Sequence, residues 1–218
     1  TIVGEDFGEE GLGCIYILEN TETHERCSVK MLAKTQVCGD GMSSNGTGDT
    51  DGQLVPYIPT VSNIWRVADL LEREVYDFYG IVFLGHPDMR RLFLRSDFKG
   101  YPFRKDWKFD DSYTLEDDVE PNYGLEYYLD KDGNPQSKQN ILFTADDYVI
   151  NIGPQHPATH GVLRLQTVLE GEVVKKTYPH FGYIHRGIEK MWESMTYPQT
   201  LALTDRLNYL GAMQHRHA

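Results

Sequence analysis

The segment NIGPQHPATHG (residues 151–161) follows one apolar, strand-like run, Tyr148–Ile152, and leads into another, Val162–Leu169. Its two prolines fix φ and its two glycines permit positive φ, so we expect a loop that holds a single shape. Such a loop would present His156 and His160 in fixed directions. Taken alone, however, two histidines in a loop are more often structural than functional, and an Asn-Gly turn would close a hairpin equally well.

The overall composition is that of an ordinary globular protein with an acidic balance. The chain has 218 residues, of which 40% are hydrophobic and 25% are charged, and its formal charge is −12. This length allows one or two domains with a substantial core. The negative charge argues against a nucleic-acid partner, because phosphate contacts need clustered lysine and arginine. The sequence has no run of about 18 apolar residues, so we expect no membrane-spanning helix.

The cysteines indicate the redox environment of the protein, and the two ends of the sequence indicate whether it is complete. Cys14, Cys27 and Cys38 show no Cys-x-x-Cys spacing, so we expect no disulfide framework, zinc site or iron–sulfur site built by this chain alone. A reducing, cytoplasmic setting fits best. The first residues are unlike a signal peptide. The chain begins without Met and Tyr197–Ala218 still has a helical pattern at its end, so we interpret the sequence as part of a longer protein.

Hydrophobic periodicity predicts the main elements. Apolar runs separated by turn residues predict strands at Gly13–Glu19, Arg26–Leu32, Asp147–Ile152, Val162–Leu169 and Glu172–Thr177. Apolar residues at helical spacing predict helices at Ser62–Tyr79, Tyr183–Met195 and Tyr197–Ala218. We expect Ser62 or Asn63 to cap the first of these helices and Gly80 to end it.

Two stretches have the composition of connecting segments. Lys34–Gln53 is rich in glycine and poor in large apolar residues, so we expect a flexible insertion that cannot offset its ordering entropy. Phe109–Gln139 is acidic and rich in turn residues, which is typical of a linker. Its tyrosines, Tyr123, Tyr127 and Tyr128, could still pin it to a neighbouring surface.

Charged residues are frequent in and after the first helix. On composition alone, its acidic residues would form a solvated face and the basic residues beyond it would be surface charge. The residues concerned are Glu72, Glu74, Asp77, Arg90, Arg91, Arg104 and Lys105.

The order of these residues, however, resembles a known family. The run LEREVYDFYGIVFLGHPDMRR (residues 71–91), followed by GYPFRKD (residues 100–106), closely resembles the C subunit of respiratory complex I. The resemblance implies an α/β domain without cofactors that scaffolds its neighbours in the peripheral arm. It also implies that the acidic and basic residues are paired internally and across subunit interfaces. The N-terminal part of that domain is expected to lie outside this sequence, and the 34–53 insertion departs from the family pattern.

A second resemblance covers the rest of the chain. NIGPQHPATHGVLRL (residues 151–165), PHFGYIHRGIEK (179–190) and TDRLNY (204–209) look like the D subunit of complex I, in that family's order and spacing. Together the two matches resemble the fused C–D subunit of NADH:quinone oxidoreductase. They imply an α+β chain with an α/β C-like part (residues 1–108), an acidic linker (109–139), and the β-sheet-plus-helices N-terminal portion of a D-like part (140–218).

The D resemblance implies site residues. On their own, Arg206 would be a surface ion-pairing residue and Tyr209 a packing residue. The family places the loop with His160 against the quinone headgroup and Tyr209 on the opposite side, and sets Arg186 and Arg206 beside the terminal iron–sulfur cluster. Asn208 stands where the family usually has an acidic residue. The remaining loop candidates are Gly153, His156, Pro157, Thr159 and Gly161.

The resemblance also implies cofactors, partners and location. Quinone is the substrate, whereas NAD and the iron–sulfur clusters are held by partner subunits, and no metal is bound by this chain. The expected partners are the other peripheral-arm subunits, above all the one that carries the terminal cluster, and the membrane-arm subunits. The expected location is peripheral, on the cytoplasmic side of the inner (plasma) membrane.

Two other function classes bear comparison. The D subunit is related to the large subunit of nickel–iron hydrogenases, which hold their metal by Cys-x-x-Cys pairs. Here the matching position reads RLNY (residues 206–209) and no cysteine follows Cys38, so hydrogenase activity is disfavoured. The other alternative is a purely structural assembly subunit of a related membrane-bound oxidoreductase that uses a donor other than NADH. We expect the isolated chain to be inactive and to bind no quinone alone.

Overall fold

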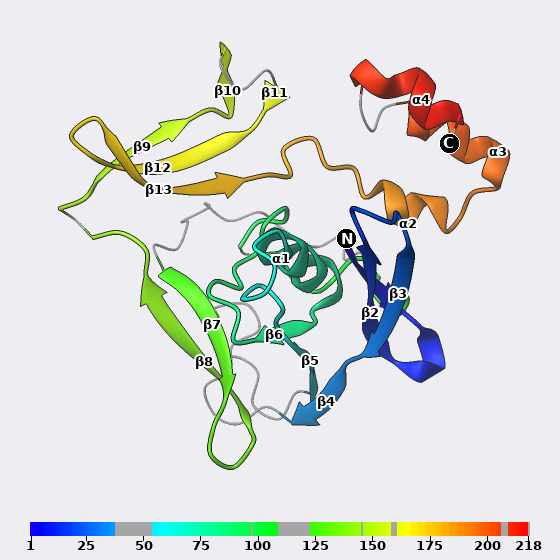
Figure 1. The fold of residues 1–218 in the computed structure, drawn as a ribbon, viewed down its shortest axis with the longest axis horizontal. Coiled ribbons are helices and arrows are strands. Elements are labelled where there is room, and N and C mark those ends of the chain that lie inside the picture. The colour runs from blue at the N-terminus through cyan, green and yellow to red at the C-terminus, as the bar shows by residue number, and fades with distance from the viewer. Residues whose placement is uncertain are drawn as a thin grey trace. The chain divides into compact units, whose positions relative to one another are not determined.

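The computed structural model describes residues 1–37, 54–96, 98–108, 123–144, 146–157, 161–205 and 209–217 (Figure 1). They form two compact units, Thr1–Tyr183 and Ile184–Ala218. The architecture is α+β, with several small sheets and few helices, which confirms the predicted fold class. Among the helices that the structure describes, none is both long and apolar enough to cross a lipid bilayer.

The first sheet is antiparallel, in the order β1–β2–β3, and consists of β1 (Ile2–Asp6), β2 (Leu12–Glu19) and β3 (Arg26–Leu32). A short 3-10 turn, η1 (Gly8–Glu10), joins β1 to β2. The two strands predicted here are confirmed. Ile2 lies opposite Tyr16 on the face that packs into the core, next to the fully buried Cys14.

The second sheet has the order β4–β5–β6 and joins β4 (Lys34–Val37), β5 (Leu54–Pro59) and β6 (Val82–Leu84). β4 is antiparallel to β5, and β5 is parallel to β6. The flexible insertion expected at Lys34–Gln53 is therefore wrong for its first four residues. These four residues precede Gly39, the first glycine of the stretch, and pair with β5. Residues 38–53 lie outside the described residues.

The helix predicted at Ser62–Tyr79 is shorter in the structure. Helix α1 covers Ala68–Tyr79, begins after Val67 without a side-chain cap, and ends at Gly80 as predicted. The cap expected at Ser62 or Asn63 is wrong. Residues 61–67 instead form turns, because the Glu72 carboxylate accepts hydrogen bonds from the Val61 N–H (2.8 Å) and the Thr60 hydroxyl (2.5 Å) and holds the incoming chain against the helix.

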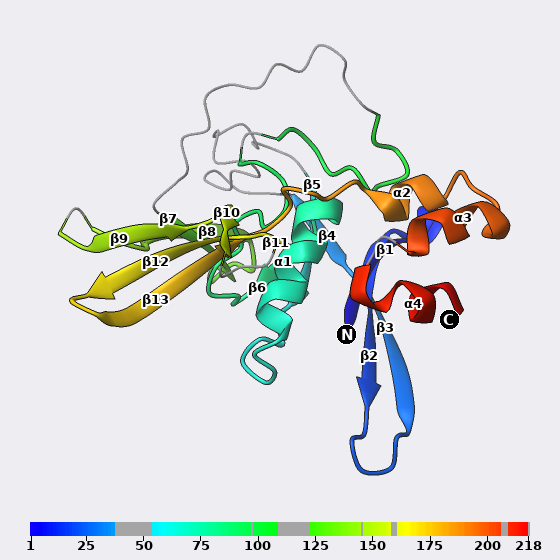
Figure 2. The same cartoon turned by 90° about the horizontal axis from the view of Figure 1, so that it is seen from above.

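The stretch expected as a linker is folded from Tyr123 onward. It contains a β-hairpin of β7 (Tyr123–Leu129) and β8 (Pro135–Ile141). Tyr127 is fully buried in the same core as Tyr76, with ring centroids 6.3 Å apart. Figures 1 and 2 show α1 between the β1–β2–β3 sheet and this hairpin. The linker composition gave no sign of this hairpin, but Tyr127 does pin the stretch to the core, as one of the three tyrosines considered for that role. Residues 109–122 lie outside the described residues. The domain boundaries themselves stay a prediction.

The D-like part opens with a sheet of order β13–β12–β9, formed by β9 (Tyr148–Ile152), β12 (Arg164–Glu170) and β13 (Val173–His180). The short strands β10 (Gln155–His156) and β11 (Gly161–Val162) form a separate pair. The three predicted strands are confirmed, except that the run predicted at 162–169 is interrupted at Leu163, between β11 and β12.

The described residues of the second unit form short helices, α2 (Ile188–Trp192), α3 (Tyr197–Thr204) and α4 (Ala212–His217), with a 3-10 turn η3 (Tyr209–Gly211). The helix predicted at 183–195 starts only after Gly187, whose φ is 60°. Helix α3 begins with a capping box in which Thr196 and Gln199 satisfy each other's backbone N–H groups. The single helix predicted at 197–218 is wrong, because η3 separates α3 from α4.

Candidate functional site

The predicted quinone loop rises from a tight junction at Gly153. Its φ is 93°, and a Cβ at this position would collide with the Leu163 carbonyl, so glycine is required. The Gly153–Pro154 peptide bond is cis. Beyond it, β10 and β11 pair so that His156 lies opposite Gly161. The structure therefore brings both ends of the loop together as a narrow hairpin.

The tip of the loop lies outside the described residues. His156 and Pro157 are exposed on the hairpin, whereas Thr159 and His160 belong to the stretch 158–160, for which nothing is described. The role of His160 at the quinone stays a prediction. The exposure of His156 and its pairing opposite Gly161 agree with a loop-shaping residue.

The other predicted site residues belong to the second unit. Arg186 is exposed in the turn before α2, where the Gly187 N–H donates to His185 Nδ1 at 3.2 Å. Arg206 lies outside the described residues. Tyr209 begins η3, but its side chain also falls outside the described part of the chain. The pocket made by Tyr209 and His160 stays a prediction.

The C-like part holds a buried ionic centre around Asp77. Its Oδ2 accepts hydrogen bonds from the N–H groups of Leu92 (3.0 Å), Phe93 (2.7 Å) and Leu94 (2.9 Å). Its Oδ1 pairs with Arg91 Nη1 at 2.9 Å, and the two side chains are almost completely buried, with exposures of 0% and 6%. Burial alone would lower the pKa of Arg91, but Asp77 and two neighbouring tyrosines raise it above its ordinary value.

This centre overturns one interpretation of the sequence. A solvated helix face is wrong for Glu72 and Asp77, which are both fully buried. Surface charge is wrong for Arg91, which also donates to the carbonyls of Phe98 and Gly100. The internal pairing that the C-subunit resemblance implies is confirmed for Asp77 and Arg91.

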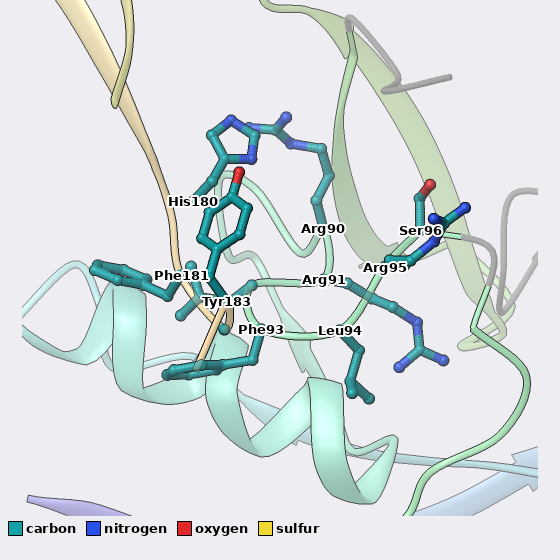
Figure 3. Close-up of a pocket in the computed structure, with 11 residues that line it drawn as sticks. Arg90, Arg91, Phe93, Leu94, Arg95, Ser96, His180, Phe181 and Tyr183 are labelled. Atoms are coloured by element: carbon teal, nitrogen blue, oxygen red, sulfur yellow. The ribbon is translucent and has the colours of Figure 1, made fainter. Parts of the chain in front are cut away.

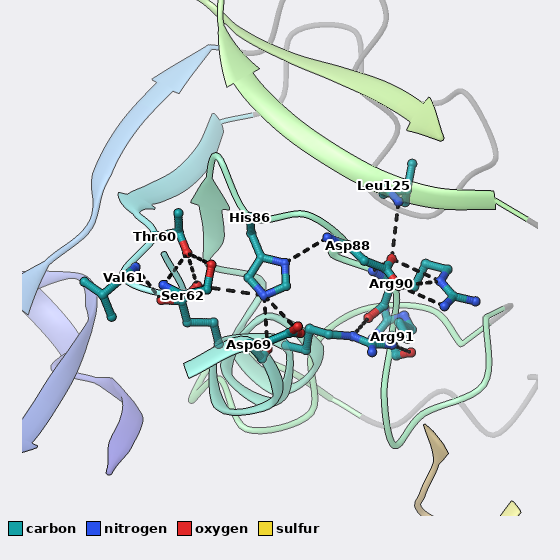
Figure 4. Close-up of polar contacts among 11 residues, drawn as sticks. Thr60, Val61, Ser62, Asp69, His86, Asp88, Arg90, Arg91 and Leu125 are labelled. Atoms are coloured by element: carbon teal, nitrogen blue, oxygen red, sulfur yellow. Dashed lines mark hydrogen bonds and ion pairs between the residues drawn. The ribbon is translucent and has the colours of Figure 1, made fainter. Parts of the chain in front are cut away.

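A second polar cluster lies at the N-terminal half of α1 (Figure 4). His86 is fully buried; its Nδ1 accepts from the Asp88 N–H (3.0 Å), so its Nε2 carries the proton and donates to the Asp69 carbonyl (3.0 Å). Burial lowers the pKa of His86, which keeps the ring neutral. Burial raises the pKa of Glu72, against the effect of its hydrogen bonds from Thr60 and Val61.

Asp88 links this cluster to the rest of the chain. Its carboxylate engages Arg90 through Nε at 3.0 Å and Nη2 at 2.8 Å. It also accepts from the Leu125 N–H at 3.4 Å, which ties it to β7. Burial would raise the pKa of Asp88, but the arginines around it lower it. The charged residues of this region therefore hold the fold together.

A cavity of about 350 Å³ lies beside the ionic centre (Figure 3). It is lined by residues 90–96 of the C-like part and 180–183 at the end of β13. The rings of Phe93 and Phe181 are 5.8 Å apart at its edge. This cavity was not predicted from the sequence: residues 180–183 and the two arginines, Arg90 and Arg91, fall within the quoted motifs, but residues 92–96 lie outside them.

The described residues contain no group of three or more His, Cys, Asp or Glu side chains that could hold a metal ion. Cys14 is buried, and burial followed by the nearby Glu72 raises the pKa of its thiol to about 12, so it stays protonated. Cys27 is exposed on β3. Since Cys38 lies outside the described residues, the absence of a bound metal stays a prediction.

Comparison with known proteins agrees with this architecture. Residues 1–113 match the family model described as "Respiratory-chain NADH dehydrogenase, 30 Kd subunit". The NADH-quinone oxidoreductase C/D subunit of Phocaeicola vulgatus is 52% identical over 223 residues, covering 100% of this chain and 39% of the relative. The C/D subunit of Bacteroides fragilis is 53% identical over 95% of this chain, and that of Acinetobacter baumannii is 36% identical over 71%.

These matches identify the family. The chain spans 39% of the length of the first of these curated relatives and 36% of the second. Its similarity to the C/D subunits runs through both the C-like and the D-like part, which confirms the resemblance drawn from the sequence. The chain belongs to the family of the 30 kDa subunit of respiratory-chain NADH dehydrogenase, as a portion of a fused C/D subunit.

Proposed function

We propose that this chain works in the peripheral arm of a complex I-type NADH:quinone oxidoreductase. Its C-like part scaffolds neighbouring subunits, and its D-like part helps to form the quinone-reduction pocket next to the terminal iron–sulfur cluster. The observation that carries the proposal is its similarity, over the whole length of the chain, to relatives named as C/D subunits of NADH-quinone oxidoreductase. The narrow hairpin of β10 and β11, which carries the histidine loop, supports the location of the pocket.

The chemistry of the reaction explains the proposed residues. Reducing a quinone to a quinol takes two electrons and two protons, and both carbonyl oxygens gain negative charge as electrons arrive. The Tyr209 phenol can donate a hydrogen bond to one oxygen. The His160 imidazole can donate to the other, because an imidazole is the side chain that exchanges a proton most readily near neutral pH.

The electron supply belongs to partner subunits in this proposal. NAD and the iron–sulfur clusters are bound there, and a terminal cluster beside the quinone supplies the electrons. The positive charges of Arg186 and Arg206 would favour the reduced cluster and raise its potential. The complex would sit at the cytoplasmic side of the inner (plasma) membrane and contact membrane-arm subunits.

The test is quinone-reductase turnover of the full-length protein in its native membranes. We expect Tyr209→Phe and His160→Ala each to lower turnover at least tenfold, about 1.4 kcal/mol of barrier, while native gels show a complete complex. The alternative is a purely structural assembly subunit, whose donor need not be NADH. Two assembled variants with normal turnover would favour that alternative and refute the proposed pocket.

A further inference from the structure

The D-like part touches the C-like part through a small set of specific contacts at the end of β13. The ring of Phe181 packs on the ring of Phe93 with centroids 5.8 Å apart and planes inclined by 31°. Figure 3 shows both rings on the same side of the cavity. Gly182 has a φ of 94°, and a Cβ there would collide with the Phe93 carbonyl. The backbone at Gly182 therefore lies directly against Phe93, which only glycine permits.

A second contact lies on the same strand. The guanidinium of Arg90 stands 5.4 Å from the centre of the Tyr178 ring, at cation–π distance. The Tyr178 hydroxyl donates to the Leu142 carbonyl at 3.3 Å. Because Asp88 holds the Arg90 guanidinium in place, Tyr178 meets a fixed partner.

The C-like side of these contacts is rigid for an identifiable reason. The Phe93 N–H donates to the buried Asp77 carboxylate at 2.7 Å, and the N–H groups on either side of it do the same. Asp77 in turn belongs to α1 and is paired with Arg91. Three charge-assisted hydrogen bonds to one buried oxygen fix the backbone of residues 92–94, and with it the direction of the Phe93 side chain.

Chain connectivity carries this restraint toward Arg186. Arg186 is the fourth residue after Gly182, so the two can lie at most about 14 Å apart. The influence of a fixed charge on a redox centre falls with distance. If the chain is anchored four residues before Arg186, the distance from its guanidinium to a nearby redox centre varies less than it would on a free segment.

We propose that residues 91–94, held by Asp77, form a platform that anchors residues 180–183, and that Phe93 and Gly182 act through this anchor and the chain that follows it as positioning residues for Arg186. The functional half of this inference rests on the proposed function, in which Arg186 tunes the terminal cluster. The structural half concerns the anchoring alone and is tested separately.

Hydrogen–deuterium exchange of the full-length protein tests the anchoring. In Phe93→Ala we expect the amides of residues 180–187 to exchange at least threefold faster relative to those of α1, and Gly182→Ala should do the same by inserting a methyl group into the contact. Phe93→Tyr keeps the ring and should restore the wild-type ratio. An unchanged ratio in both disrupting variants would overturn the platform.

The control is Phe103→Ala, which removes an aromatic ring of the same size from the C-like core. Phe103 stacks on Phe78 with centroids 4.3 Å apart. Its loss should weaken the fold as a whole while leaving the exchange ratio between residues 180–187 and α1 at its wild-type value. A ratio that rises equally in Phe103→Ala would show general loosening and contradict a local platform.

The functional half is tested in the assembled complex by redox titration of the terminal cluster. We expect Arg186→Gln to lower the midpoint potential, Phe93→Ala to lower it by a smaller amount, and Phe93→Tyr to restore it. Faster exchange with an unchanged potential in Phe93→Ala would overturn the positioning role. An unchanged potential in Arg186→Gln would instead refute the cluster-tuning role itself, and the exchange result would still stand.

Discussion

Charged and polar side chains are treated differently in the two parts of this chain. In and after α1, Glu72, Asp77 and His86 are fully buried and each has defined partners at hydrogen-bond distance. In the D-like part, His156 and Arg186 are exposed. The first group is surrounded by its own chain, whereas the second faces outward.

This difference in burial distinguishes charges that stabilise the fold from charges that can bind a ligand or a partner. Burying an ion costs several kcal/mol, which only partners with excellent geometry offset, so a buried, fully partnered charge has no capacity left for a substrate. An exposed charge adds little to stability and remains available to a ligand or a partner subunit. On this basis the buried charges of the C-like part maintain the scaffold, and we expect the candidate site in the D-like part.

The largest expected effect comes from removing the buried charge. Asp77→Asn leaves Arg91 buried without its carboxylate and weakens three hydrogen bonds, so we expect a loss of about 3–5 kcal/mol in the free energy of unfolding. Urea denaturation of the purified full-length protein measures it. Asp132→Asn, at an exposed turn, is the matched control and should change stability by less than about 0.5 kcal/mol. Equal losses in the two variants would erase the contrast between buried and exposed charges.

The next effect tests the base of the exposed hairpin. Gly153→Ala forces a left-handed φ of 93° and a collision with the Leu163 carbonyl, so we expect a local cost of about 1–3 kcal/mol. Faster amide exchange in β10 and β11 would report it. Gly171→Ala is the control, because Gly171 also has a positive φ of 62° but no atom within 4 Å of the added Cβ. If both variants behave alike, the close approach to Leu163 contributes nothing.

Part of the fold could be predicted from the sequence. The strand signals predicted β2 and β3 within a residue, although only β2 has buried residues and every residue of β3 is exposed. The start of α1 was missed since Ile64 and Val67 fit the helical period although both are exposed in turns. The hairpin at 123–141 was missed because its acidic neighbours dominate the composition and Tyr127 alone is the deeply buried aromatic among its described residues.

The site was only partly predictable for a different reason. The order of the motifs indicated the loop at 151–161 and the segment at 179–190. Sequence motifs, however, do not show how far apart their residues lie in the folded chain. The packing of Phe93 on Phe181 joins residues far apart in the chain, and it depends on the register of β13 and on the three N–H groups that Asp77 collects. Periodicity reports which face of one element is buried, and it does not report which other element covers it.

A smaller effect depends on pH. Burial lowers the pKa of His86 below its ordinary 6.5, so the unfolded chain takes up a proton at a higher pH than the folded chain does. Stability is therefore full above pH 6.5 and falls as the pH drops toward the folded pKa, by at most about 1.4 kcal/mol per pH unit. Urea unfolding between about pH 7.5 and 5.5 should show this slope in wild type and less of it in His86→Asn. A slope that His86→Asn leaves unchanged would assign the effect to other groups.

The smallest effect comes from an exposed ion pair with nearly the same geometry as the buried one. Arg26 and Glu19 approach to 2.8 Å on β3 and β2, compared with 2.9 Å for Arg91 and Asp77, but their side chains are 71% and 40% exposed. Water and salt screen this pair, so Arg26→Gln should cost no more than about 0.5 kcal/mol, and less still in about 1 M salt. Urea unfolding at low and high salt measures both values. A loss close to that of Asp77→Asn would mean that distance rather than burial sets the strength of these pairs, and the division between scaffold charges and site charges would fail with it.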